Sequence, residues 1–162
     1  MKTTLLSILF FSILLSSCET KVTTSVGTND QSDAIKTEVT YHASHEPKKA
    51  NAPFSDAVQV GNMYFLSGQI GMDQTTRTLV EGGVEAETTQ TLENIKAVLA
   101  QHGMDMSDVV KSLVVLDDIG DFAAFNAIYK TYLPQKPART TFAAEALAAG
   151  AKIEIEVIAV KQ

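Results

Sequence analysis

The first structural signal in the chain is a pair of short apolar runs separated by a turn. Residues 58–60 and 63–66 are rich in apolar and β-branched or aromatic side chains, and the dipeptide Gly61-Asn62 lies between them. A two-residue loop of this composition favours a tight turn between antiparallel strands, so we predict a β-hairpin. Residues 38–41 are a candidate for an earlier edge strand.

Two longer segments repeat their apolar residues at helical spacing. Residues 85–102 place one set of side chains on a single helical face, namely Thr88, Leu92, Ile95 and Leu99. Gly103 follows and is a typical helix stop. A second helix is predicted over residues 121–132, with Asp118 or Asp121 favouring its start and prolines beyond its end.

Further apolar, β-branched stretches predict strands at 109–116, 140–144 and 151–160, and the polar stretch 73–83 predicts a loop. Three strands, a helix, a strand, a helix and two strands then follow in order. This order is typical of an α+β two-layer sandwich, with a mixed β-sheet and two long helices. The helices cover one face of the sheet, and several apolar strand residues suggest that the other face needs a partner as well: Leu113, Val115, Ile153, Ile155 and Val157.

Residues 1–17 have the layout of a secretory signal peptide. Lys2 gives a positive start, residues 5–15 form an apolar run broken only by two serines, and Leu15-Ser16-Ser17-Cys18 resembles a bacterial lipobox. The run is too short for a membrane-spanning helix, which needs about 20 apolar residues. Cys18 is the only cysteine, so we expect it to carry a lipid that anchors the protein to a membrane of the bacterial cell envelope, on its periplasmic or surface side. The alternatives are a plain secreted protein and a chance occurrence of Ser-Ser-Cys.

Composition divides the rest of the chain into a tether and one domain. Residues 18–37 are too polar to form a core and predict a flexible tether, with residue 50 as an alternative end. Residues 38–162 are long enough for one domain with its own core. The net charge of −6 becomes −7 without residues 1–17, which hold one lysine and no acid. We therefore expect no nucleic-acid partner, because phosphate binding needs clustered Lys and Arg.

An arginine and a glutamate near the end of the chain could serve one small acidic ligand. Pro137 excludes a helix around Arg139, and Glu154 lies inside the predicted strand 151–160. If these strands are neighbours, the two side chains reach one cleft, where the guanidinium suits a carboxylate and Glu154 can orient water or move a proton. The alternative is an ordinary cross-strand ion pair.

His42 and His45 have no third ligand nearby, so we expect no metal site.

Seven segments of the chain, taken in order, carry a family resemblance: 52–58, 61–70, 85–88, 91–96, 121–126, 137–139 and 153–156. Together they resemble the Rid family, also called the YjgF or L-PSP family. The resemblance extends from about residue 50 to the C-terminus. It implies a chorismate mutase-like fold that forms homotrimers with ligand clefts between subunits.

The resemblance also implies an activity, the hydrolysis of 2-imino acids to 2-keto acids and ammonia, as in 2-iminobutanoate/2-iminopropanoate deaminases, without a cofactor. By position, Arg139 would bind the substrate carboxylate and Glu154 would position the attacking water. Three further positions match residues that line the cleft: Ser67, Gly68 and Asn126. The chain departs from the pattern at two cleft positions, Phe54, where a tyrosine is usual, and Thr141, where a cysteine is frequent. A non-catalytic binding module for small carboxylates, using the same arginine, is therefore the alternative function.

Overall fold

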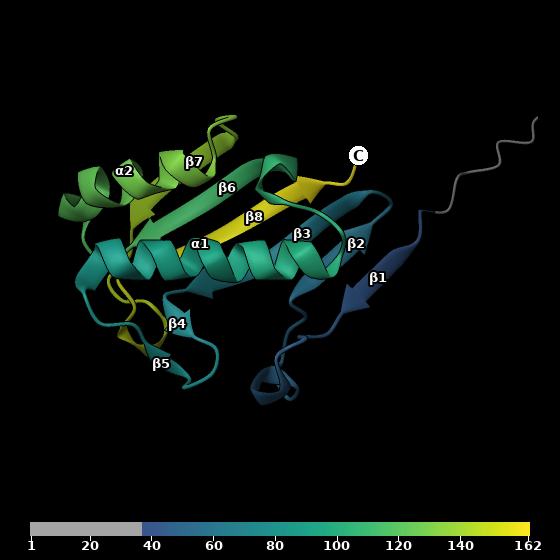
Figure 1. Ribbon diagram of the computed structural model, residues 1–162, viewed down its shortest axis with the longest axis horizontal. Helices are drawn as coiled ribbons and strands as arrows, with labels where there is room; N and C mark the ends of the chain where they lie inside the picture. Colours follow the sequence, from purple (N-terminus) through teal and green to yellow (C-terminus); the bar gives the residue numbers. More distant parts are fainter. Residues whose placement is uncertain (1–36) are drawn as a thin grey trace, which may run out of the picture. The chain divides into compact units, whose positions relative to one another are not determined.

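A computed structural model describes residues 37–162, which form a mixed β-sheet with two α-helices packed on one of its faces (Figure 1). Across the sheet the strands follow the order β1 (Val39–His42), β2 (Ala57–Val60), β3 (Met63–Ile70), β8 (Ile153–Val160), β6 (Val109–Leu116) and β7 (Ala138–Ala143). The pair β6 and β7 is parallel, and the other neighbouring pairs are antiparallel. The predicted α+β two-layer fold is confirmed. The predicted signal peptide, Cys18 and the tether up to residue 36 lie outside the described residues.

The predicted hairpin is confirmed, since β2 and β3 pair Val60 with Met63 around Gly61-Asn62. Gly61 has a φ of 61°, in the left-handed region that glycine adopts without steric cost. The predicted edge strand is β1, which pairs along β2. The predicted loop at 73–83 is partly wrong, because β4 (Met72–Asp73) and β5 (Thr78–Leu79) pair as a separate two-stranded hairpin. Strands this short leave no alternating pattern in a sequence.

The two predicted helices are confirmed as α1 (Gly83–Gln101) and α2 (Phe122–Tyr132). All four residues of the predicted α1 face are fully buried. Of the two candidate capping residues, Asp118 accepts a hydrogen bond from the Gly120 N–H at 2.8 Å and caps the turn before α2, whereas the Asp121 side chain makes no capping bond. Within residues 37–162, no helix combines the length and the hydropathy that crossing a membrane requires.

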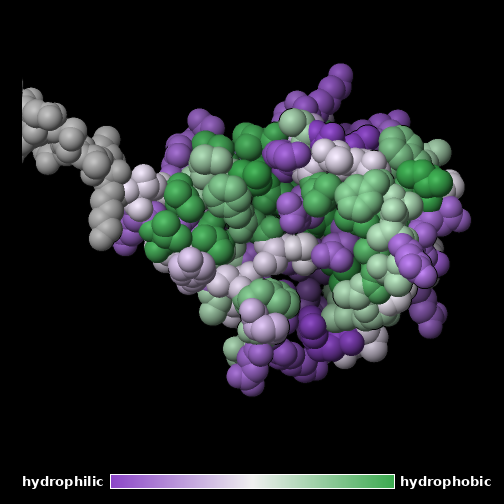
Figure 2. All heavy atoms as spheres, turned by 180° about the vertical axis from the view of Figure 1, so that it is seen from behind, coloured by the Kyte–Doolittle hydropathy of each residue, from purple (hydrophilic) through white to green (hydrophobic). Residues whose placement is uncertain are grey.

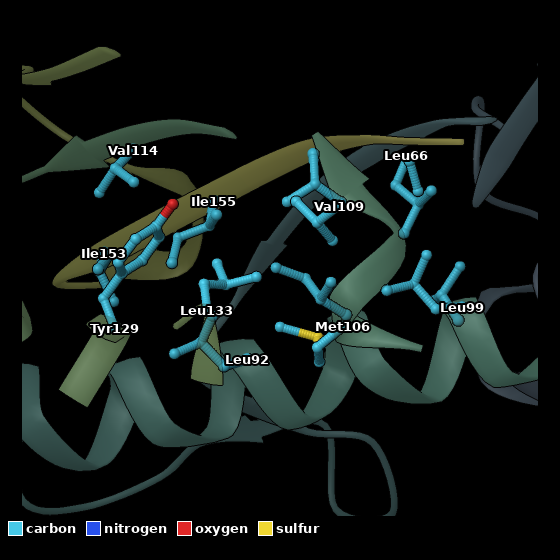
Figure 3. Close-up of a cluster of buried hydrophobic side chains, with 14 of the residues drawn as sticks. Leu66, Leu92, Leu99, Met106, Val109, Val114, Tyr129, Leu133, Ile153 and Ile155 are labelled. Atoms are coloured by element: carbon cyan, nitrogen blue, oxygen red, sulfur yellow. The ribbon is translucent and has the colours of Figure 1, made fainter. Parts of the chain in front are cut away.

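The hydrophobic core lies between the helices and the sheet. Figure 3 shows side chains from α1 pointing toward side chains from β6 and β8, and all of them are buried: Leu92, Leu99, Val109, Val114, Ile153 and Ile155. Each such side chain contributes roughly 1.5–3 kcal/mol on burial. Short 3-10 helices link the elements: η1 (Pro47–Lys49), η2 (Met106–Asp108), η3 (Ile119–Asp121) and η4 (Ala148–Gly150).

The alternation of side chains along each strand divides the sheet residues between the helix-covered face and an open face. Ile153, Ile155 and Val157 are buried under the helices, so the prediction that they need a partner on the other face is wrong. Leu113 and Val115 do lie on the open face, half-buried. Two exposed aromatic side chains extend this apolar surface, Phe65 opposite Ile158 and Phe142 opposite Val115. Figure 2, which views the molecule from the side away from the helices, shows apolar side chains over much of this face.

Candidate functional site

Arg139 and Glu154 lie on opposite faces of the sheet. Arg139 is paired with Ser112, which is buried on the helix-covered face and hydrogen-bonds the Tyr129 hydroxyl of α2. Glu154 is paired with Val115, on the open face. The prediction that neighbouring strands bring both residues to one cleft is therefore wrong within a single chain, because β6 separates β7 from β8. The alternative ion pair is not formed either, among the salt bridges of residues 37–162.

Glu154 lines a cavity of about 430 Å³, and so do three residues predicted to contact substrate: Phe54, Ser67 and Gly68. A β-bulge brings Ser67 and Gly68 to this place, since the register between β3 and β8 shifts between Leu66 and Gln69. The Gly68 backbone lies directly against the Glu154 carboxyl group, and a Cβ added to Gly68 would overlap it. Only glycine allows this close approach.

The environment of Glu154 suits a proton acceptor. Burial raises the pKa of Glu154 above its ordinary value, and the nearby Glu156 carboxylate raises it further. A carboxylate with a raised pKa accepts a proton more readily near neutral pH than an ordinary glutamate does. Within the same cavity, the Ser67 hydroxyl donates to the Ser55 carbonyl oxygen at 2.7 Å and so keeps its acceptor lone pairs for a ligand. Phe54 is 51% exposed and adds an apolar wall.

Arg139 is held in a fixed position on the helix-covered face of the sheet. Its Nη1 donates to the Asn126 Oδ1 at 2.8 Å, and its Cζ lies 4.7 Å from the ring centroid of Tyr129. The rings of Phe125 and Phe122 are 5.3 and 5.7 Å away. Cation–π contacts and one amide acceptor therefore orient the guanidinium while leaving most of its five N–H donors for a ligand. Asn126, predicted to line the cleft, acts here as the positioning residue of Arg139.

A second cavity, of about 340 Å³, contains both Asn126 and Arg139 in its lining. Thr141 follows Arg139 on β7 by two residues, so its side chain lies on the same face of the sheet. The Thr141 hydroxyl oxygen is buried and has no hydrogen-bond partner among the described residues. The predicted site residues thus fall into two groups, a glutamate group (Phe54, Ser67, Gly68 and Glu154) and an arginine group (Asn126, Arg139 and Thr141).

Residues 43–161 match the family described as endoribonuclease L-PSP. The chain belongs to the L-PSP family, also called the Rid or YjgF family. Among Rid relatives, DfrA of Myxococcus xanthus is 48% identical over 122 residues, which are 74% of this chain and 92% of DfrA. The 2-iminobutanoate/2-iminopropanoate deaminase of Mus musculus is 44% identical over 113 residues, 69% of this chain and 84% of the mouse protein.

Solved structures of other Rid proteins have the same fold. A putative endoribonuclease L-PSP from Entamoeba histolytica superimposes with a TM-score of 0.71 at 39% identity, covering 76% of this chain and 100% of that chain. The YjgF gene product of E. coli gives a TM-score of 0.69 at 34% identity, covering 76% and 99% of the two chains. The predicted family resemblance and its fold are therefore confirmed.

Four polar residues line the glutamate cavity of this Rid protein without having been predicted as site residues: Lys49, Gln69, Gln74 and Arg77. Lys49 forms a salt bridge with Asp56 at 2.9 Å, with only 8% and 3% of the two side chains exposed. Gln74 and Arg77 belong to the turn between β4 and β5. No sequence signal identifies Gln74 and Arg77 as cavity residues, because their position beside the cavity depends on the path of the short β4–β5 hairpin.

The histidines lie apart from both groups. His42 and His45 line, together with His102, a cavity of about 410 Å³, in which the ring centroids of His42 and His102 are 4.4 Å apart. Burial lowers the pKa of His102, and neighbouring positive groups lower it further. Within residues 37–162, no group of three or more His, Cys, Asp or Glu side chains is arranged to hold a metal ion.

Proposed function

We propose that this Rid protein hydrolyses 2-imino acids to 2-keto acids and ammonia in clefts that assemble between the subunits of a homotrimer. The proposal rests on two groups with complementary chemistry that lie on opposite faces of the sheet and that only a second copy of the chain could bring together. One face of the sheet holds a positioned arginine, and the other face holds a glutamate with a raised pKa beside a cavity. Two relatives named as 2-iminobutanoate/2-iminopropanoate deaminases, from mouse and human, support the reaction class.

The two groups have the chemistry that hydrolysis of an imine needs. Arg139 pairs with the substrate carboxylate through a charge-assisted fork, which fixes the orientation of the neighbouring imine carbon. Glu154 accepts a proton from water as the water oxygen bonds to the carbon of the protonated imine and the C=N π electrons move to nitrogen. The nitrogen of the resulting carbinolamine takes that proton back from Glu154. The C–N bond then breaks, ammonia leaves with the bonding electrons, and the hydroxyl proton passes through Glu154 to ammonia or water as the keto oxygen forms.

Assembly of the cleft requires a second copy of the chain. The open face around Glu154 carries exposed apolar side chains, including Phe65 at 39% and Phe142 at 45% exposure, which a second copy would cover. Arg139 lies on β7, at the edge of the sheet. An edge residue of one subunit can approach the open face of the next, and a closed ring of three copies would repeat the contact three times.

The decisive experiment mixes two inactive subunits. Arg139→Ala and Glu154→Gln chains with different tags are co-expressed, and mixed trimers are isolated by tandem purification. A mixed trimer contains two chains of one variant and one chain of the other. In both cases, one of the three interfaces joins the intact Arg139 of a Glu154→Gln chain to the intact Glu154 of an Arg139→Ala chain, so about one third of wild-type activity is expected. Activity is measured as faster keto acid release from imines that an amino acid oxidase generates in the presence of semicarbazide.

The control co-expresses two differently tagged Arg139→Ala chains, which should stay inactive. Mixed trimers without restored activity would refute a shared site. A monomer in light scattering at micromolar concentration would refute the assembly.

The residue at position 54 favours a second candidate function, a carboxylate-binding module, because Phe54 supplies no hydroxyl to the cavity. If the wild type binds 2-oxobutanoate through Arg139 but leaves imine hydrolysis unchanged, the protein is a carboxylate-binding module.

We also propose that the domain is tethered to a membrane of the bacterial cell envelope through a lipid on Cys18. The proposal is supported by the sequence Leu15-Ser16-Ser17-Cys18 after an apolar run. Several acyl chains on one cysteine hold a protein stably, where one chain is marginal. Mass spectrometry of the native membrane fraction should detect a chain that begins at acylated Cys18, and Cys18→Ala should move the protein out of that fraction. An unmodified Cys18 in the soluble fraction of native cells would contradict this.

A further inference from the structure

Among residues 37–162, Arg77 adds to the cavity of Glu154 a positive charge that forms no salt bridge. Both side chains line the same cavity of about 430 Å³, and Arg77 is half-buried. Lys49, the other cation of the cavity, is neutralised by its salt bridge with the nearly buried Asp56. Arg77 forms no salt bridge among those of residues 37–162, and its Nη1 donates to the neutral Gln74 Oε1 at 2.6 Å.

The backbone holds Arg77 in an unusual conformation. Arg77 has a φ of 63°, in the left-handed region that side-chain-bearing residues rarely adopt and that glycine adopts freely. The turn that imposes this φ is well supported: the Asp73 carboxylate accepts from the N–H groups of Thr75 and Thr76 at 2.7 and 3.0 Å. The Arg77 N–H donates to the Asp73 carbonyl oxygen at 2.9 Å. A strained residue whose side chain lines a cavity is a reason to look for a role in that cavity.

We infer that Arg77 recognises a second acidic group on the substrate, so that the preferred substrates are 2-imino acids whose side chain carries a carboxylate. This inference rests on the proposed function. Arg139 of a neighbouring subunit takes the carboxylate beside the imine, and Arg77 takes the carboxylate at the far end. A guanidinium that already has one neutral partner keeps a planar set of donors for a carboxylate. Gln74 then acts as a positioning residue, since its amide oxygen fixes one side of the guanidinium.

The test compares substrates with and without the second carboxylate. Imines of 2-aminobutanoate, aspartate and glutamate are generated in place by amino acid oxidases, and hydrolysis is followed with semicarbazide as the competing trap. The wild type should show a higher kcat/KM for the two diacids. Arg77→Gln should lower kcat/KM for the diacids about tenfold to a hundredfold, the loss expected for one charge-assisted contact, and change the monoacid by less than about twofold.

Two further variants separate charge from backbone. Arg77→Gly removes the charge and relieves the positive φ, so it should lose the diacid preference while folding normally. Arg77→Lys keeps the charge and should retain part of the preference. An equal loss on both substrate classes would assign Arg77 a structural role and overturn the inference. A wild type that prefers the monoacid would overturn it as well.

A binding measurement distinguishes failure of this inference from failure of the proposed function. Calorimetry compares 2-oxobutanoate with oxaloacetate and 2-oxoglutarate as stable stand-ins for the imines. If no imine of either class is hydrolysed, the proposed hydrolase function fails. Recognition by Arg77 is still supported if the diacids bind more tightly and Arg77→Gln removes that advantage. Equal binding of both classes to the wild type overturns it.

Discussion

Glu154→Gln should lower kcat about a hundredfold to ten-thousandfold, the range for losing a general base, while changing the affinity for 2-oxobutanoate by less than about twofold. The amide has nearly the shape of the carboxylate but cannot accept a proton from water. Gly68→Ala should produce a similar loss by a different route, because its Cβ would displace the Glu154 carboxyl group. Steady-state kinetics with oxidase-generated imines measure kcat, and calorimetry with 2-oxobutanoate measures the affinity.

The pH dependence of kcat provides an independent readout of the same residue. Since burial raises the pKa of Glu154, its carboxylate form is lost at a higher pH than for an ordinary glutamate as the solution is acidified. Activity should therefore fall on the acid side at a pH above the usual glutamate range, and Glu154→Gln should remove this limb. Glu156→Gln is the matched control on the same strand and face. It should stay active and shift the limb to lower pH, because one source of the raised pKa is gone.

Retention of more than half of kcat in Glu154→Gln would contradict the role assigned to this residue. Loss of binding and turnover by the same factor would also contradict it, since that pattern indicates a contact made equally in the ground state and the transition state.

Lys49→Met should lower the free energy of unfolding by about 3–5 kcal/mol, the cost of leaving one partner of a buried ion pair without the other. The Lys49 and Asp56 side chains are 8% and 3% exposed, and the Asp56 Oδ2 has no hydrogen-bond partner among the described residues. Without Lys49, the Asp56 carboxylate would keep only His45 as a neighbour, whose Nδ1 lies 3.8 Å from the Asp56 Oδ2, beyond hydrogen-bond distance. Urea unfolding at one fixed protein concentration measures the change, because assembly makes apparent stability depend on concentration.

Two comparisons test the cause of this destabilisation. Lys96→Met breaks a surface pair with Glu93, whose side chains are 55% and 45% exposed, and should cost no more than about 1 kcal/mol. The double variant Lys49→Met with Asp56→Leu should recover much of the loss, since it removes both charges. If Lys49→Met costs no more than Lys96→Met, the buried salt bridge contributes little to the stability of the domain.

The sequence by itself determined the main secondary-structure elements, except the short hairpin of β4 and β5. It also supplied the residues of the glutamate and arginine groups, but not four polar residues that line the glutamate cavity: Lys49, Gln69, Gln74 and Arg77. Local periodicity is enough to define α1 and β6, and the dipeptide Gly61-Asn62 is enough to define a hairpin. The alternation of Ile153 and Ile155 with Glu154 also contained the signal that this glutamate points away from the helix-covered face.

Only the tertiary structure decided how these residues relate in space. Strand pairing is non-local, so nothing near Arg139 in the chain indicates that β6 lies between β7 and β8 or which face Arg139 occupies. The bulge at Ser67 and Gly68 and the approach of Arg77 arise from register and from the path of the β4–β5 hairpin. Because side chains alternate along a strand with a period of two, the pairing of Arg139 with Ser112 and of Glu154 with Val115 decides that these two side chains lie on opposite faces of the sheet.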